Sequence, residues 1–133
     1  MAVSAEVSMA QTKRALVVDD EETVGQVMCH VLQQMGYQVD HVLDGQQALD
    51  MARGRDYNAV VCDLLMPGVN GMALFEAWQA ENPDLARKVI FVTGDSLGTD
   101  TSEFVARSGC PCIYKPFRLA QLADLVESMD EVR

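Results

Sequence analysis

The chain has few basic residues. Of its 133 residues, 10 are Lys or Arg and 20 are Asp or Glu, which gives a formal net charge of −10. Proteins that bind nucleic acid use a positive surface to release counterions from phosphates, so we expect no direct contact with nucleic acid. The same charge disfavours a polybasic contact with an anionic membrane surface. With 49% apolar residues, the sequence is nevertheless too apolar for a disordered acidic chain.

Long hydrophobic runs are also lacking. The strongest ones, such as Ala15–Val18 and Val89–Val92, are far shorter than the roughly 20 residues of a transmembrane helix. Residues 1–11 have neither the basic start nor the apolar centre of a signal peptide. We therefore expect a cytoplasmic protein without a membrane segment, with a flexible lead-in at residues 1–12 and one domain at residues 13–133.

Cysteine is scarce, with four in the chain. Cys110 and Cys112 lack the spacing of a zinc knuckle, and no second Cys or His pair completes such a site. We expect these two, together with Cys29 and Cys62, to be ordinary small residues in a reducing compartment.

What the sequence does contain is an alternation of short apolar runs with amphipathic stretches. The runs predict strands at Ala15–Val18, Tyr37–Leu43, Tyr57–Cys62, Val89–Val92 and Cys112–Tyr114. The stretches predict helices at about residues 24–35, 44–52, 72–78, 99–107 and 119–129. Gly36 is placed to end the first helix in a left-handed conformation, and Asp44 with Gln47 resembles a capping box that begins the second.

This alternation predicts the fold class. Strands separated by helices imply right-handed crossovers and a parallel sheet with helices on both faces. We predict an α/β fold, a (βα)5 flavodoxin-like three-layer sandwich with strand order 2-1-3-4-5. The strand at Tyr37–Leu43 is the most polar and is expected at an edge. In such folds the site lies at the carboxyl ends of the strands, where the strand order reverses.

Residues that could carry chemistry follow four of the five predicted strands: Asp19, Asp20 and Glu21, then Asp63, Thr93 and Lys115. If the first and third strands are neighbours, the three aspartates converge on one pocket. Carboxylates this close repel one another without a cation, and hard oxygen ligands favour Mg²⁺ or Mn²⁺. Lys115 would supply a point charge and Thr93 a hydroxyl donor to phosphoryl oxygens. The set is typical of phosphoryl transfer to an aspartate nucleophile.

Each of these residues alone has a simpler interpretation. The acidic run Asp19–Glu21 could merely cap a helix, because acidic residues favour the first turn. Asp63 and Thr93 could be turn residues, and Lys115 could be a solvated surface lysine. Their occurrence together, at the ends of four of five strands, favours the site.

These motifs, in this order, resemble the receiver domain of two-component response regulators. The resemblance extends over residues 13–129 and rests on Leu16–Glu21 (LVVDDE), Asp63–Gly71 (DLLMPGVNG), Thr93–Gly94 and Lys115–Phe117 (KPF). Each motif is modest alone, whereas their combination on these predicted elements is highly specific.

The resemblance implies a role for each site residue. Asp63 would accept a phosphoryl group from a histidine kinase or a phosphotransfer protein. Asp20, Asp63 and the main-chain carbonyl of Leu65 would bind Mg²⁺ directly, and Asp19 would act mainly through water. Thr93 and Lys115 would bind the phosphoryl oxygens. Such a domain catalyses only its own phosphorylation and dephosphorylation, so we do not expect an enzyme acting on separate substrates.

The resemblance also implies a switch. The acyl phosphate would draw Thr93 inward and repack the surface of the helix at 99–107, the strand at 112–114 and the last helix. This surface would contact a downstream effector, the rest of a parent chain or a second copy in a homodimer. The supporting structural positions are Pro67, Gly71, Gly94, Cys112, Tyr114 and Pro116, with a cis peptide expected at Lys115–Pro116.

One position departs from the family pattern. Receivers often carry an aromatic residue three positions before the lysine, where this chain has Cys112. Tyr114 is aromatic, but it directly precedes Lys115 and should face the opposite way from it in a strand. The usual coupling between the threonine and an aromatic ring is therefore in doubt.

Other classes fit less well. A flavodoxin-type cofactor binder needs a Ser-, Thr- or Gly-rich phosphate loop where Asp19–Glu21 would repel phosphate. A haloacid-dehalogenase-like phosphatase needs an Asp-x-Asp motif after the first strand, whereas the acids here are adjacent. The same receiver module within a hybrid sensor histidine kinase stays open as an alternative. His30 and His41 lack a kinase's phosphohistidine motif and are interpreted as structural.

Overall fold

A computed structural model describes the backbone of residues 12–94 and 99–132 and the side chains of residues 12–94 and 101–129. The strands are β1 (Lys13–Val18), β2 (Tyr37–Val42), β3 (Ala59–Asp63), β4 (Val89–Thr93) and β5 (Cys112–Tyr114). The helices are α2 (Glu22–Gln34), α3 (Gly45–Gly54), α4 (Gly71–Glu81), α5 (Pro83–Ala86), α6 (Thr99–Ser108) and α7 (Leu119–Val132). The expected lead-in, apart from Thr12, and the loop at residues 95–98 lie outside the described residues.

The five strands form one parallel sheet in the order β2-β1-β3-β4-β5. This order confirms the predicted topology and the edge position of β2. All residues of the inner strands β3 and β4 are buried, which explains their continuous apolar runs. The middle of β2 is only partly buried, as its more polar sequence indicates.

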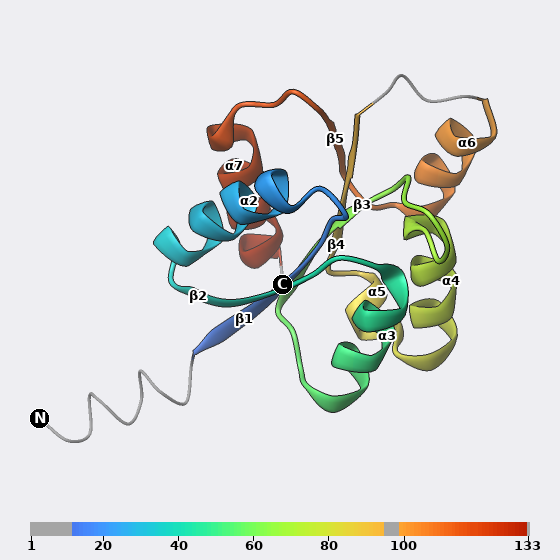
Figure 1. Ribbon diagram of the computed structural model, residues 1–133, viewed down its shortest axis with the longest axis horizontal. Coiled ribbons are helices and arrows are strands. Elements are labelled where there is room, and N and C mark those ends of the chain that lie inside the picture. The colour runs from blue at the N-terminus through green and yellow to red at the C-terminus, as the bar shows by residue number, and fades with distance from the viewer. Residues whose placement is uncertain (1–11, 95–98, 133) are drawn as a thin grey trace, which may run out of the picture.

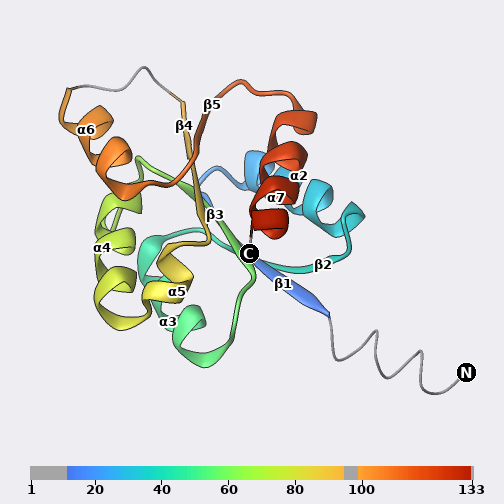
Figure 2. The same ribbon diagram turned by 180° about the vertical axis from the view of Figure 1, so that it is seen from behind.

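Helices cover both faces of the sheet (Figures 1 and 2). On one face, α2 and α7 pack over Ala15 and Val17 of β1; on the other, α3, α4 and α6 cover alternate residues such as Leu16. The second face contains a cluster of rings from Phe75, Phe91 and Phe104, whose centroids lie 5.7–5.9 Å apart in edge-to-face pairs. The two cores hold the strand ends in fixed positions.

Local signals at the helix ends agree with the sequence. Gly36 follows α2 with φ +98°, the left-handed conformation that favours glycine. The Asp44 carboxylate accepts a 2.8 Å hydrogen bond from Gln47 N and so caps α3. The Gln47 side chain binds Leu43 N, one residue earlier than in a regular capping box.

The short helix α5 was not predicted from the sequence. Asn82 begins it by accepting a hydrogen bond from Leu85 N, and Pro83 occupies its first turn. None of the described helices combines the length and apolar character needed to cross a membrane. All four cysteines lie in the described part of the chain as free thiols, as expected.

Candidate functional site

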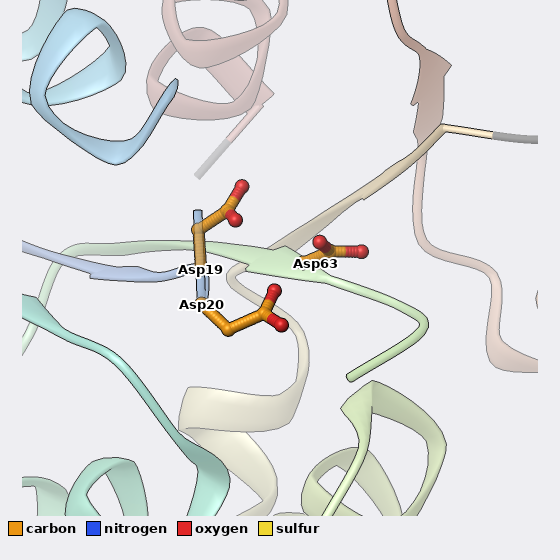
Figure 3. Close-up of side chains that lie close together, drawn as sticks. All are labelled: Asp19, Asp20 and Asp63. Atoms are coloured by element: carbon orange, nitrogen blue, oxygen red, sulfur yellow. The ribbon is translucent and has the colours of Figure 1, made fainter. Parts of the chain in front are cut away.

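The carboxylates predicted to converge do so. Asp19 and Asp20 follow β1, and Asp63 ends the neighbouring strand β3, so the sheet register places them side by side (Figure 3). One potential ligand oxygen from each lies within 4.8 Å of the others. Asp19 and Asp63 are buried, whereas Asp20 is exposed. Two buried acids this close are unfavourable without a compensating cation.

Lys115 approaches the cluster from the end of β5. Its Nζ lies 3.1 Å from Asp19 Oδ2, 3.2 Å from Asp63 Oδ2 and 2.8 Å from Glu21 Oε1. Its main-chain N donates a 2.7 Å hydrogen bond to Thr93 O, which ties the lysine to the end of β4. A single lysine is therefore shared among several carboxylates, and negative charge remains in excess.

The pKa values reflect this crowding. Burial is the largest influence on the pKa of Asp63 and raises it above its usual value, and the charge of Asp19 adds to the rise. The charge of Lys115 and a hydrogen bond from Leu65 N oppose it. For Lys115, burial alone would lower the pKa, but its contacts with Glu21 and Asp19 and the charge of Asp63 outweigh burial and raise it. Lys115 is therefore held as a cation.

The hydroxyl group of Thr93 is buried at the same end of the sheet. Its side chain is fully buried, and Oγ1 has no hydrogen-bond partner among the described residues. An unsatisfied buried hydroxyl costs about 1–3 kcal/mol, so each such group calls for an explanation, such as a catalytic role or a bound water or ion. Thr93 ends β4 directly beside β3, the strand that carries Asp63. The acidic cluster could hold a metal ion, and the Thr93 hydroxyl lies at the same end of the sheet.

Hydrogen bonds and close packing fix the loop that follows Asp63. Leu65 N donates a 3.1 Å hydrogen bond to Asp63 Oδ1, which orients the carboxylate. Gly71 N donates to Leu64 O at 3.1 Å. A Cβ atom at Gly71 would lie 2.8 Å from Asp63 O, so only glycine allows α4 to begin this close to the loop. Pro67 is exposed in the same loop.

The remaining predicted positions lie in β5 or directly after β4 and β5. The peptide Lys115–Pro116 is cis, which confirms the expectation. At Gly94 an added Cβ would meet only Lys115 Cδ, at 3.9 Å, among the described residues. Cys112 packs against the core, and Tyr114 is 51% exposed and in register with Thr93. Within the described part of the chain, neither Cys112 nor Tyr114 touches the acidic cluster.

A groove opens beside Lys115. Its volume is about 480 Å³, and its walls are formed by Glu21, Thr23, Val24, Val27, Gly94, Lys115, Pro116, Phe117 and Leu119. Two large apolar side chains at this groove, Val27 and Leu119, are 42% and 47% exposed. The groove therefore places an exposed apolar surface next to Lys115.

Two contacts of the site were not predicted from the sequence. Glu21 was placed in the acidic run but not as a partner of Lys115, which is 94 residues away. His41 was interpreted as structural only, yet its ring lies against the main chain of Asp19. No local pattern marks either contact, because each joins separate strands or strand ends.

Comparison with known proteins identifies the family. A model of the response regulator receiver domain matches residues 15–127. The chain belongs to this family, the receiver domains of two-component systems.

Two curated relatives differ greatly in length. The response regulator receiver protein CpdR of Brucella abortus is 26% identical over 117 residues, which cover 88% of this chain and 96% of CpdR. The sensor kinase CckA of the same organism is 33% identical over 118 residues, which cover 87% of this chain but only 12% of CckA. The chain thus spans nearly all of one relative and a small part of the other.

Among solved structures, the response regulator protein TrrA of Thermotoga maritima has a TM-score of 0.77 at 27% identity. The match covers 89% of this chain and 99% of TrrA. TrrA was crystallised in complex with Mg²⁺ and BeF.

Proposed function

We propose that this chain is a phospho-accepting receiver that takes a phosphoryl group onto Asp63 from a phosphohistidine. The donor would be a histidine kinase or a phosphotransfer protein, which would place the chain in the cytoplasm. The observation that supports this best is the position of the Asp63 carboxylate, whose Oδ2 lies 3.2 Å from Lys115 Nζ. Thr93, whose hydroxyl has no partner among the described residues, is the last residue of the neighbouring strand β4.

In the proposed reaction, a carboxylate oxygen of Asp63 attacks phosphorus, and the phosphorus–nitrogen bond to the donor histidine breaks. The departing imidazole nitrogen keeps the electron pair and takes up a proton, and Asp63 becomes an acyl phosphate. Lys115 would exchange its carboxylate contacts for a phosphoryl oxygen, and the Thr93 hydroxyl would donate to another. Both side chains are already present at the strand ends before the phosphoryl group arrives, as electrostatic preorganisation requires.

The acidic cluster fits a hard divalent cation. Asp20, Asp63 and the main-chain oxygen of Leu65 would hold Mg²⁺ or Mn²⁺ directly, with Asp19 acting through water. One carboxylate oxygen from each of Asp19, Asp20 and Asp63 lies within 4.8 Å of the others, and the bound Mg²⁺ of TrrA supports the choice of metal. When bound, the cation would neutralise the cluster and the charge on the phosphoryl oxygens.

The groove beside Lys115 is the proposed approach for the donor, because it joins the site and exposes Val27 and Leu119. Output would pass through α6, β5 and α7, whose surface would bind an effector or a second copy of the chain. Since Cys112 offers no ring, Tyr114 is the aromatic residue of β5 nearest to Thr93 in register. A shift of Thr93 would then change the surroundings of Tyr114, its partner in the sheet register.

A second candidate is the same module as part of a hybrid sensor histidine kinase. The 33% identity to CckA, of which the chain spans 12%, favours this parent. A phosphatase that turns over aspartyl phosphate is the less favoured alternative, because Asp19 and Asp20 are adjacent and the proposed nucleophile is on another strand.

Stoichiometry separates a receiver from a phosphatase. The intact chain is incubated with acetyl phosphate and Mg²⁺, and both protein-bound phosphoryl groups and free phosphate are measured. A receiver takes up at most one base-labile phosphoryl group per chain and loses it slowly. Rapid, continuous release of phosphate without a labelled protein would support the phosphatase instead.

A further inference from the structure

The ring of His41 reaches from the edge strand β2 to the turn that carries the acidic cluster. Its Nε2 lies 3.2 Å from the main-chain oxygen of Asp19. On the other side of the same residue, Asp19 N donates a 3.2 Å hydrogen bond to Val42 O. Strand β2 therefore holds the backbone of Asp19 through two consecutive residues. Because the Asp19 carbonyl belongs to the peptide that leads into Asp20, the His41 contact fixes the orientation of that peptide.

Gly25 makes room for this ring. It is buried in the first turns of α2, and an added Cβ would overlap Nε2 and Cε1 of His41. Glycine inside a helix costs about 1 kcal/mol relative to alanine. Its presence here is explained by the His41 ring, which occupies the space that a side chain at position 25 would fill.

The side chain of Asp20 depends on this support. It is exposed, and none of the described residues holds it by a hydrogen bond or an ion pair. Asp19 and Asp63, in contrast, are held by Lys115 and by the main-chain N of Glu21 and Leu65. Because no such contact holds the Asp20 carboxylate among the described residues, its position depends on the orientation of its backbone.

We propose that His41 is a positioning residue for Asp20. The His41 ring packs against Gly25, and its Nε2 donates a hydrogen bond to the Asp19 carbonyl. This hydrogen bond orients the peptide that presents Asp20 to a divalent cation. This inference rests on the proposed role of Asp20 in binding Mg²⁺. Residues that orient metal ligands typically change metal affinity by about 10- to 100-fold when removed.

The test compares Mg²⁺ affinity with stability in the intact chain. Affinity is measured by calorimetry, and the midpoint of thermal denaturation is measured separately in EDTA. We expect His41→Ala to weaken Mg²⁺ binding about tenfold. Adding Gly25→Ala to this variant should raise the denaturation midpoint, because alanine favours the helix and the ring is gone. The Mg²⁺ affinity of the double variant should stay at the level of His41→Ala.

A merely structural role predicts that affinity recovers with stability in the double variant, and that result would overturn the proposal. An unchanged affinity in His41→Ala would overturn it as well. The matched control is His30→Ala, an exposed histidine on α2, which should leave Mg²⁺ affinity unchanged.

A metal-free measurement examines the contact itself. Long-range proton–nitrogen NMR spectra of the wild-type chain should show a proton on Nε2 of His41, and His41→Ala should shift the Asp20 amide resonance. A neutral ring protonated only on Nδ1 would contradict the donor role. Failure of the wild-type chain to bind Mg²⁺ would count instead against the proposed function, so the two failures are distinguishable.

Discussion

Two groups of carboxylates in this molecule differ in how they are paired. On β2, Asp40 Oδ2 accepts hydrogen bonds from Arg55 at 3.0 Å and from Tyr57 at 2.6 Å, two residues that precede β3. Nearby, Glu81 pairs with Arg53 at 2.8 Å. Each of these two acids has a guanidinium partner, although Arg53 also lies 3.8 Å from Asp50, and the charge of each is balanced locally.

At the carboxyl ends of the strands, the pairing is incomplete. Asp19, Glu21 and Asp63 share the single Nζ of Lys115, and Asp20 has no partner among the described residues. Within the part of the chain that the structure describes, the buried Thr93 hydroxyl also has no partner. Acidic residues alone therefore do not indicate a site. What indicates the site is a buried excess of negative charge, which a cation would neutralise, beside a hydroxyl that a phosphoryl group would satisfy.

The largest contrast is expected in phosphorylation. Asp63→Asn should abolish base-labile labelling by acetyl phosphate and Mg²⁺, because the amide is not a nucleophile. Asp40→Asn, which alters the balanced group, should retain labelling. The measurement is incorporation of labelled phosphate into each intact chain. Equal labelling of Asp63→Asn and the wild type would remove the distinction between the two groups.

A smaller but clear effect is expected in metal binding. Asp20→Asn should weaken Mg²⁺ affinity about tenfold or more, equal to about 1.4 kcal/mol or more, since a hard cation loses an anionic oxygen ligand. Calorimetry of the metal-free chain measures the change. The control is Asp84→Asn, an exposed acid on α5, which should bind Mg²⁺ as the wild type does.

Stability should reveal the excess charge directly. Because burial raises the pKa of Asp63, its folded pKa lies above its unfolded one, and the metal-free fold loses stability as pH rises through the folded value. At neutral pH without metal, Asp63→Asn should therefore denature at a higher temperature than the wild type.

The same comparison has two internal checks. The advantage of Asp63→Asn should vanish at acidic pH, where Asp63 is protonated. Mg²⁺ at about 100 times its Kd should stabilise the wild type by about 2.7 kcal/mol and remove the advantage. A variant less stable than the wild type in EDTA at neutral pH would contradict the claim of uncompensated charge.

The smallest effect is expected in the balanced group. Tyr57→Phe removes the hydrogen bond to Asp40 and should lower the free energy of unfolding by about 1 kcal/mol. Mg²⁺ affinity and labelling should not change, because Tyr57 contacts no residue of the site. Chemical denaturation alongside calorimetry measures both; a loss of Mg²⁺ affinity would show that the two groups are coupled.

Much of the fold is encoded in local patterns. The apolar runs that became β1, β3 and β4, the glycine after α2 and the cap at Asp44 are visible in a few consecutive residues. The helix α5 was missed because four residues are too few for a periodic pattern, and its signal was only Asn82 followed by Pro83.

The site was predictable only in part. The topology rule brings the ends of β1 and β3 together, so the convergence of Asp19, Asp20 and Asp63 followed from the strand order. The pairing of Glu21 with Lys115 and the packing of His41 on Gly25 did not follow from it. Such contacts depend on side-chain directions across the fold, which leave no periodic signal in the sequence.

In the proposed function, Asp63 is the residue that carries the phosphoryl group. The most direct measurement is reduction of the phosphorylated chain with borohydride, which converts an aspartyl phosphate to homoserine, followed by mass spectrometry of its peptides. We expect homoserine at position 63 and at no other aspartate. Homoserine at position 19 or 20, or at none, would contradict the claim.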